Sequence, residues 1–240
     1  MWDKPQQLRL ISNALFGISL LLLVYGVLHY TLRLPVFALQ AIQLSAAPRQ
    51  VDVAQIAAVV RHELRGNFFT VDLENMRRAF EQLPWVRKAS VRRQFSWRLE
   101  VELEEHVALA RWNDTGMVNT HGEVFEAGAN QVLPGFIGQA EHAAEVTQMY
   151  GVFAAQLAPL KREIAQISLS PRRAWQLRLD NGMVLKLGRE QSQQRLARFV
   201  AVYPYSLAPL KSTVSYVDLR YRNGFAAFMP GGAGTVKGET

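Results

Sequence analysis

Near its start the chain has one long apolar stretch without a charged residue. Residues 10–32 read LISNALFGISLLLLVYGVLHYTL and contain no Asp, Glu, Lys or Arg. As a helix this segment would exceed the roughly 30 Å thickness of a bilayer's hydrocarbon core. The pattern therefore predicts a transmembrane helix over residues 10–32. A cleaved signal peptide is the alternative, but its apolar segment is normally shorter, and residues 38–41 match a cleavage site only weakly.

The charges that flank this stretch predict its orientation. Lys4, Arg9 and the terminal amine stand against Asp3 before it, whereas Arg33 alone lies close behind it. The positive-inside rule then places residues 1–9 in the cytoplasm as a short head and the bulk of the chain on the other side of the membrane.

The next region, residues 33–105, changes its hydrophobic period twice. Residues 36–44 suit a strand, and Asp52 and Asp72 then begin two amphipathic helices, the second of which ends at Pro84. From residue 89 to residue 103 apolar side chains fall mostly on odd positions and polar ones on even positions. This period of two predicts a hairpin that turns near residues 95–98, with its first strand basic and its second acidic. Cross-strand ion pairs explain the alternate glutamates better than a metal or acid/base cluster does.

Residues 106–228 predict a second domain of short strands and two helices. Turn signals separate strand candidates at 107–112, 117–119, 123–125, 164–169, 175–179 and 183–187. Helical spacing appears at 146–157 and 196–203. The last two strands, 214–221 and 225–228, flank an Asn223-Gly224 turn, and the Gly/Pro-rich residues 229–240 suggest a flexible tail. The predicted fold class is α+β: one transmembrane helix, a strand-helix-helix-strand-strand domain, and a mostly antiparallel β-domain with packed helices.

Composition narrows the chemistry more than it identifies a function. The chain has no cysteine, five scattered histidines and a net charge of +7 over 240 residues. No phosphate-binding loop and no helical His-x-x-x-His pair is present. We therefore expect no catalytic residue, no metal and no cofactor.

Several sequence blocks resemble a known family. The order of elements after the anchor, with LPWVRKASVRR at residues 83–93, is similar to the POTRA domain of the FtsQ/DivIB family of bacterial cell-division proteins. RWNDTGMVNTHGEVF, RRAWQLRLDNGMVLKLGRE and YVDLRYRNGFAAF are similar to successive blocks of the family's β-domain. The chain departs from the family at two turns, with Phe95-Ser96 in place of Trp-Pro and Ala46-Ala47 in place of a glycine.

The resemblance implies a function and partners. It implies a non-catalytic, single-pass inner-membrane scaffold at the division septum, with residues 33–105 as the POTRA domain and 106–228 as the β-domain. The expected partners are FtsB and FtsL, with FtsK, FtsA, FtsW and FtsI as further neighbours. A nucleic acid or a small-molecule substrate is not expected. Two other functions stay open, an extracytoplasmic cell-wall hydrolase and a POTRA-type export chaperone.

Two arguments point to the interaction residues. A final strand of only four residues leaves an unpaired edge to which another chain can add a strand. The resemblance independently implies an FtsB-binding surface and a recruitment surface. The FtsB-binding residues would be Arg220, Tyr221, Asn223, Gly224, Phe225 and Phe228, with Arg173 as a helper on a neighbouring strand. The POTRA recruitment residues would be Lys88, Val91 and Arg93. Tyr221 and Phe225 have the alternative role of core packing.

Overall fold

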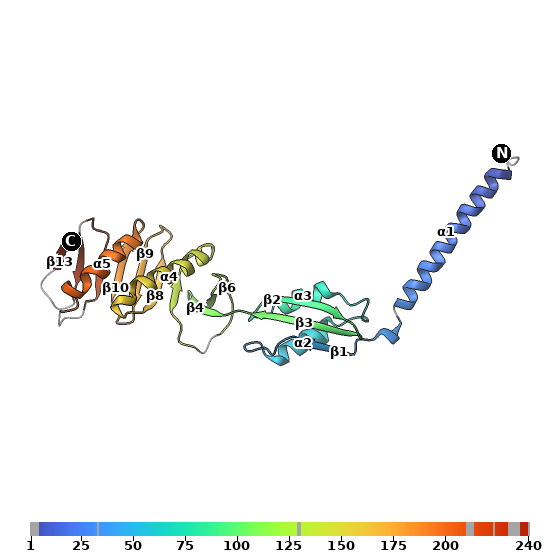
Figure 1. The fold of residues 1–240 in the computed structure, drawn as a ribbon, viewed down its shortest axis with the longest axis horizontal. Coiled ribbons are helices and arrows are strands. Elements are labelled where there is room, and N and C mark those ends of the chain that lie inside the picture. Colours follow the sequence, from blue (N-terminus) through green and yellow to red (C-terminus); the bar gives the residue numbers. More distant parts are fainter. Residues whose placement is uncertain are drawn as a thin grey trace. The chain divides into compact units, whose positions relative to one another are not determined.

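The computed structural model describes residues 5–32, 34–128, 131–209, 214–222, 224–229 and 236–239. The chain divides into two compact units, Met1–Glu105 and His106–Thr240. Figure 1 shows the order of their elements along the chain.

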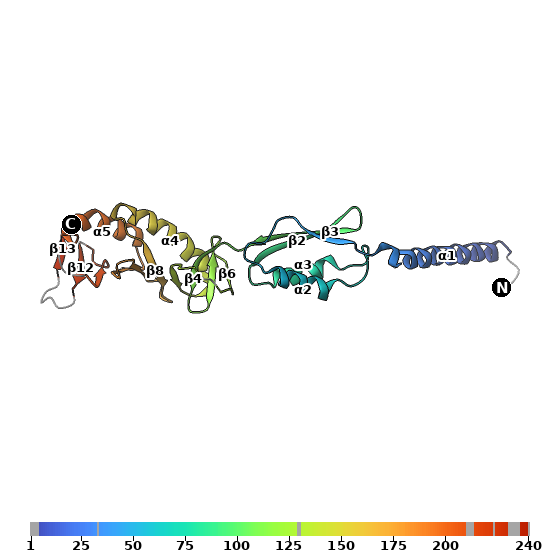
Figure 2. The same ribbon diagram turned by 90° about the horizontal axis from the view of Figure 1, so that it is seen from below.

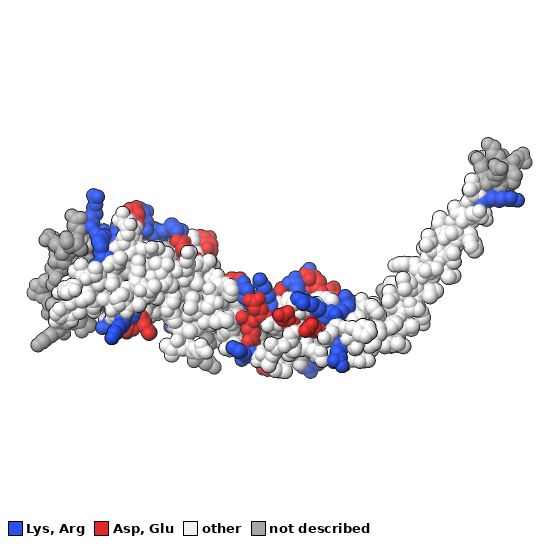
Figure 3. All heavy atoms as spheres, in the orientation of Figure 1, with Lys and Arg blue, Asp and Glu red and all other residues white. Residues whose placement is uncertain are grey.

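The N-terminal helix α1 (Pro5–Leu32) contains the apolar stretch. Its Arg9–Leu32 segment is long and apolar enough to cross a membrane, and none of that segment is buried inside the protein. Figure 3 shows α1 free of charged atoms except next to its N-terminal end, and Arg9 is the one charged residue among residues 5–32. A helix that is apolar on every side is suited to a lipid environment, as expected of a single-pass anchor.

The rest of the first unit is a three-stranded sheet covered by two helices. The strands are β1 (Ala41–Leu44), β2 (Val86–Gln94) and β3 (Arg98–Glu105), in the order β1-β3-β2. β3 runs parallel to β1 and antiparallel to β2. The helices are α2 (Val53–Glu63) and α3 (Leu73–Glu81), and Figure 2 shows them on one side of the sheet. The predicted strand-helix-helix-strand-strand order is confirmed.

Local sequence signals account for these elements. The Asp52 carboxylate accepts the backbone N–H of Ala54 at 2.8 Å, and Asp72 accepts that of Asn75 at 3.0 Å, so each aspartate caps its helix. The predicted apolar positions meet in one core, whose fully buried side chains are Met76, Phe80, Leu99 and Val101. On the open face the register places Lys88 opposite Glu104 and Arg92 opposite Glu100. The basic strand therefore faces the acidic one, as predicted.

The segment before β1 differs from the prediction of a strand over residues 36–44. Pro35–Phe37 forms a short 3-10 turn, η1, and only Ala41–Leu44 pairs as a strand. A proline has no backbone N–H to give to a ladder, which disfavours pairing at this point. The Phe37 ring instead packs against Phe69 and Trp97.

Glu105 has a structural role at the end of β3. Its carboxylate accepts the backbone N–H groups of Arg49, Gln50 and Val51 at 2.9–3.0 Å. Partial burial opposes ionisation, but the three backbone hydrogen bonds together hold the pKa of Glu105 below its usual range. The charged form therefore fixes the loop that leads from β1 into α2.

Changing Glu105 to glutamine should destabilise the first unit by about 1–3 kcal/mol, because a neutral amide satisfies these donors poorly. Urea unfolding of the full chain in detergent measures this loss. Glu102→Gln on the exposed face of the same strand is the matched control and should change stability little. Since the folded pKa is lowered, the Glu105 contribution is present above the ordinary glutamate pKa and is lost as the pH falls through the folded value. Equal stability of the two variants at pH 7 would contradict this role.

The second unit is built on one mixed sheet of ten strands. Their order is β13-β12-β11-β10-β9-β8-β7-β4-β5-β6. The strands are β4 (Ala108–Trp112), β5 (Gly116–Asn119), β6 (Val124–Phe125), β7 (Gly135–Ile137), β8 (Ile164–Leu169), β9 (Trp175–Leu179), β10 (Val184–Gly188), β11 (Tyr216–Asp218), β12 (Gly224–Phe228) and β13 (Val236–Glu239). Neighbours pair antiparallel except at β4–β7, β7–β8 and β10–β11, which are parallel. The predicted, mostly antiparallel β-domain is confirmed.

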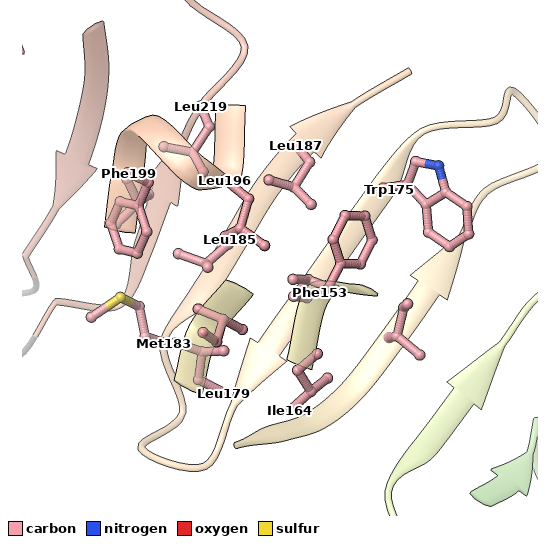
Figure 4. Close-up of a cluster of buried hydrophobic side chains, with 14 of the residues drawn as sticks. Phe153, Ile164, Trp175, Leu179, Met183, Leu185, Leu187, Leu196, Phe199 and Leu219 are labelled. Atoms are coloured by element: carbon pink, nitrogen blue, oxygen red, sulfur yellow. The ribbon is translucent and has the colours of Figure 1, made fainter. Parts of the chain in front are cut away.

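Two long helices, α4 (Ala143–Leu157) and α5 (Ser192–Ser206), pack on this sheet, and short 3-10 turns flank α4 at Ala140–His142 (η2) and Ala158–Leu160 (η3). Figure 4 shows Phe153 of α4 and Leu196 and Phe199 of α5 gathered over the strand side chains of the core. Burial of these large apolar side chains supplies most of the driving force for folding the unit.

Two strands were not predicted. β7 lies between the strand candidates 123–125 and 164–169, where no strand was predicted, and its Phe136 is fully buried between β4 and β8. Three residues are too few to show a period of two, so this strand leaves no clear sequence signal. β13 lies within the predicted flexible tail and pairs with β12. Strand pairing is made by the backbone, so a Gly-rich composition does not prevent it when an edge is available.

Candidate partner-binding site

The candidate site is centred on β12. This strand pairs antiparallel with β11, with Tyr216 opposite Phe228, Val217 opposite Ala227 and Asp218 opposite Ala226. Strand alternation gives β12 two different faces. Phe225 and Ala227 point into the core, while Phe228 is 48% exposed on the other face.

The inner face of β12 is held by α5. The rings of Phe225 and Phe199 meet edge to face, with their centroids 6.0 Å apart. Arg198 of α5 donates from Nη1 to the backbone carbonyl of Arg222, in the turn before β12, at 2.5 Å. The side chain of Phe225 is therefore a core residue, and the core-packing alternative applies to it. Only the backbone groups of Phe225 are placed to hydrogen-bond with another strand.

The outer face carries a short row of aromatic and cationic side chains. The Phe228 ring stacks on Tyr216 with their centroids 5.2 Å apart and their planes 16° from parallel. The Lys186 ammonium of β10 lies 4.2 Å from the centroid of the Tyr216 ring, a cation–π distance. Tyr216 and Lys186 were not singled out from the sequence. The sequence signal that could have placed them on the outer face is their alternation with the buried residues Val217, Leu185 and Leu187.

At the end of β11 an ion pair orders Arg220. Its Nε donates to Asp218 Oδ1 at 2.9 Å and its Nη2 to Oδ2 at 2.6 Å. These hydrogen bonds lower the pKa of the Asp218 carboxyl, against the opposing effect of its burial. Because the folded pKa is lowered, this pairing is complete at neutral pH and is lost only as the pH falls through that value. Arg220 keeps most of its side chain exposed.

Tyr221 follows Arg220 and is 58% exposed, so it does not pack in the core. Gly224 begins β12 and is half-buried. Asn223 lies outside the described residues.

Arg173 occupies a different place from the one expected. It lies in the turn between β8 and β9, with a left-handed φ of 60°, and two strands separate β9 from β12. Its guanidinium pairs with Glu145 of α4 at 2.6 Å. Trp175 nevertheless pairs with Gly188 at the end of β10, and β10 pairs with β11. The Arg220 side chain, just after β11, lies beside Gly188. Arg173 and Arg220 therefore lie at the same end of the sheet but not on adjacent strands.

The outer edge of β12 is occupied, although the sequence predicted an unpaired edge. β13 pairs with it antiparallel, with Gly224 opposite Glu239 and Ala227 opposite Val236. The pairing spans four residues. Among the described residues, β13 is then the terminal strand at this side of the sheet.

The three POTRA recruitment residues do not share one face. Lys88 is exposed on the open face of the sheet, while Val91 packs on the core beneath the helices. Arg93 donates to the backbone carbonyls of Phe68, Phe69 and Val71 at 2.7–3.3 Å, which ties β2 to the loop before α3. An alternating strand cannot present neighbouring odd and even positions to one partner face. Lys88 and Arg93 are both exposed, but they lie on opposite faces of the sheet, and Val91 is partly buried.

The part of the chain that the structure describes contains no group of three His, Asp or Glu side chains arranged to hold a metal. The five histidines do not gather: His106 stacks on Phe125, and His62 contacts Glu63. The features that stand out in the second unit are thus a strand edge and an exposed aromatic row.

Comparison with known proteins agrees with this architecture. Residues 37–106 match the family model "POTRA domain, FtsQ-type", and residues 110–220 match "Cell division protein FtsQ/DivIB, C-terminal". The chain is 43% identical to the cell division protein FtsQ of Nitrosospira multiformis over 232 residues, covering 95% of this chain and 98% of that protein. It is 40% identical to the FtsQ of Burkholderia pseudomallei over 233 residues, covering 94% of this chain and 93% of that protein.

The similarity extends to a relative that matches over a smaller part of the chain. The cell division protein FtsQ of Escherichia coli K12 is 40% identical over 169 residues, covering 67% of this chain and 61% of that protein. The two family models match both domains that follow α1, and the alignment with the Nitrosospira multiformis protein covers nearly the whole chain. The chain therefore belongs to the FtsQ/DivIB family of bacterial cell-division proteins.

Proposed function

We propose that this protein is a non-catalytic scaffold of the division machinery that binds a periplasmic strand of FtsB, and through it FtsL, along β12. The observation that carries this proposal is the contrast between the two sides of β12. Its core face is fixed by Phe199 and by the Arg198 contact to Arg222. Its other face and the adjoining turn expose Phe228, Tyr221 and Arg220. Exposed aromatic and arginine side chains beside a rigid strand are typical of binding hot spots.

Binding along β12 requires β13 to leave, since one strand edge accepts one partner. The pairing of β13 spans only four residues, so few backbone hydrogen bonds hold it to the sheet. We propose that β13 protects the edge until the partner arrives, as natural proteins commonly cover their edge strands. The apparent affinity for the partner is then reduced by the fraction of molecules in which β13 is paired.

Recruitment through the POTRA domain is a second part of the proposal. Lys88, exposed on the open face, would contact the neighbouring protein, and FtsK, FtsA, FtsW and FtsI are the expected neighbours. Val91 and Arg93 would act indirectly, by supporting β2 from its helix-covered face. Arg173 would contribute a cation at the same end of the sheet as Arg220.

The cell-wall hydrolase and the export chaperone are less well supported. Hydrolysis needs paired carboxylates, a nucleophile with its base, or a metal, and family membership gives no support for such a set. A cell-wall-cleaving activity of the purified protein that disappears on one point substitution would favour the hydrolase instead. A chaperone of the POTRA type would be expected to carry tandem POTRA repeats.

For localisation we propose a cytoplasmic head at residues 1–9 and periplasmic outer domains, because the apolar stretch at residues 10–32 is preceded by the basic residues Lys4 and Arg9. A reporter that is active only in the periplasm, fused after Thr240, should be active. The same reporter placed before Met1 is the control and should be silent. A silent C-terminal fusion, or a mature N-terminus near Ala41, would contradict this topology.

A further inference from the structure

The end of the POTRA sheet nearest α1 exposes an aromatic surface that the partner-binding proposal does not use. The register places Arg98, at the start of β3, opposite both Ala41 and Gln94. The β2–β3 turn therefore lies at the end of the sheet where the chain arrives from η1 (Figure 2). Gln40 confirms this by donating its backbone N–H to the carbonyl of Trp97 at 3.0 Å.

This end of the domain is fastened to the last turn of α1. The buried Asn67 donates from Nδ2 to the backbone carbonyls of Leu32 at 2.6 Å and Leu34 at 3.2 Å. The Asn67 Oδ1 atom meanwhile accepts the backbone N–H groups of Phe69 and Thr70. The loop that carries Phe68 and Phe69 is thus hydrogen-bonded, through Asn67, to the last residue of the apolar helix.

Four rings form a cluster at this point. Phe37, Phe68, Phe69 and Trp97 lie with their ring centroids 5.2–5.7 Å apart across η1, the loop before α3 and the β2–β3 turn. Ser96 and Trp97 have left-handed φ values of 78° and 61°. Such a conformation is unfavourable for residues other than glycine, so it must be maintained by the packing of Trp97 in the cluster.

The same turn points an apolar side chain into solvent. Phe95 is 95% exposed, and Val36 and Phe69 are 79% and 42% exposed. The three segments that build this end, residues 34–40, 64–71 and 93–98, contain Arg65, Arg93 and Arg98 and no aspartate or glutamate. Exposed aromatic and apolar side chains on segments that carry arginines and no carboxylates, close to the end of an apolar helix that can span a membrane, have the composition of a membrane-interface anchor.

We propose that this surface, formed by Phe95, Val36 and Phe69 with Arg65, Arg93 and Arg98, docks on the bilayer that α1 spans. Phe95 enters the headgroup region and the arginines face anionic phospholipid. The POTRA domain is then in contact with the membrane surface, instead of being connected to the membrane only through residues 33–40. This inference depends on the proposed membrane anchorage by α1, and the experiment below separates the two.

The absence of cysteine from the chain allows single nitroxide labels at chosen positions. The full chain is reconstituted in phosphatidylcholine nanodiscs with and without phosphatidylglycerol. Labels are placed at Gln94→Cys beside the turn, at Ser19→Cys within α1, and at Gln82→Cys beyond α3 as the exposed control. Relaxation by oxygen and by a water-soluble nickel complex reports the depth of each label.

The label at residue 94 should show the oxygen preference of the lipid interface, and the label at residue 82 should show that of water. Phe95→Ser should return residue 94 to the water value, whereas Phe95→Trp should retain docking. Removing phosphatidylglycerol should reduce docking about fivefold for each arginine that faces the surface. Because Phe95 is almost fully exposed, its replacement should leave the circular dichroism spectrum unchanged.

If residue 94 stays as water-exposed as residue 82 while residue 19 is buried in lipid, docking is wrong and the anchor stands. If residue 19 is also exposed to water, the anchor itself is wrong and docking fails with it. Docking that survives Phe95→Ser would also contradict the inference, because another surface would then be responsible.

Discussion

Replacing Tyr221 with alanine is expected to weaken binding of an FtsB periplasmic segment by about thirtyfold or more. Tyr221 is exposed beside the start of β12 and carries a large apolar ring with a polar end. Removal of an anchor of this kind typically costs about 2 kcal/mol or more of binding free energy, which corresponds to that loss. Fluorescence titration of the labelled segment with the full chain in detergent measures the change.

The matched control is Tyr205→Ala. Tyr205 is 86% exposed on α5 of the same unit but lies outside the proposed surface. We expect its replacement to leave the affinity within about twofold, as for most residues outside a hot spot. If both tyrosine variants bind like the unchanged protein while remaining folded, the partner surface does not include this turn.

Replacing Phe225 with alanine is expected to destabilise the second unit by about 3–5 kcal/mol, because the change removes a buried ring from the contact with Phe199. Phe228→Ala on the same strand is the control and should cost much less stability, since that side chain is half exposed. Urea unfolding followed by tryptophan fluorescence reports both values. The effects on partner binding should have the opposite order. When both variants are measured under conditions in which they are folded, Phe228→Ala should weaken binding more than Phe225→Ala, because only the Phe228 side chain is on the exposed face. Equal stability losses would contradict the assignment of the two faces of β12.

The sequence predicted the elements whose pattern is long and regular. The strands over 164–169 and 175–179 were placed at their observed bounds, and the resemblance to the FtsQ/DivIB family is confirmed. The two helix-capping aspartates were also identified, because a cap is a local signal of one residue type at one position.

The roles that depend on backbone contacts could not be predicted in this way. The sequence did not indicate the contacts of Glu105 or of Arg93, whose side chains bind backbone groups of distant loops. Such contacts leave no periodic pattern, because any carbonyl or N–H group can be the partner. The sequence left two roles open for Phe225, partner binding and core packing, because the direction of its side chain follows from the register of β12 against β11.

The pairing of β13 with the edge of β12 could not be predicted for the same reason, since it too is made by backbone groups. Whether a strand edge is free depends on every other segment that can reach it, and the tail from residue 229 onward has no strand-forming composition. Only the folded structure reveals that β13 pairs there.

The central claim, that the partner adds a strand to β12 in place of β13, is tested most directly by disulfide scanning. A single cysteine is introduced at Ala226 and combined with single cysteines along the FtsB segment, with and without deletion of residues 230–240. Strand pairing predicts crosslinking that peaks at one position and alternates with a period of two, and that increases when β13 is deleted. A crosslink that is absent, or that is equally strong at all positions and unaffected by the deletion, would contradict the account.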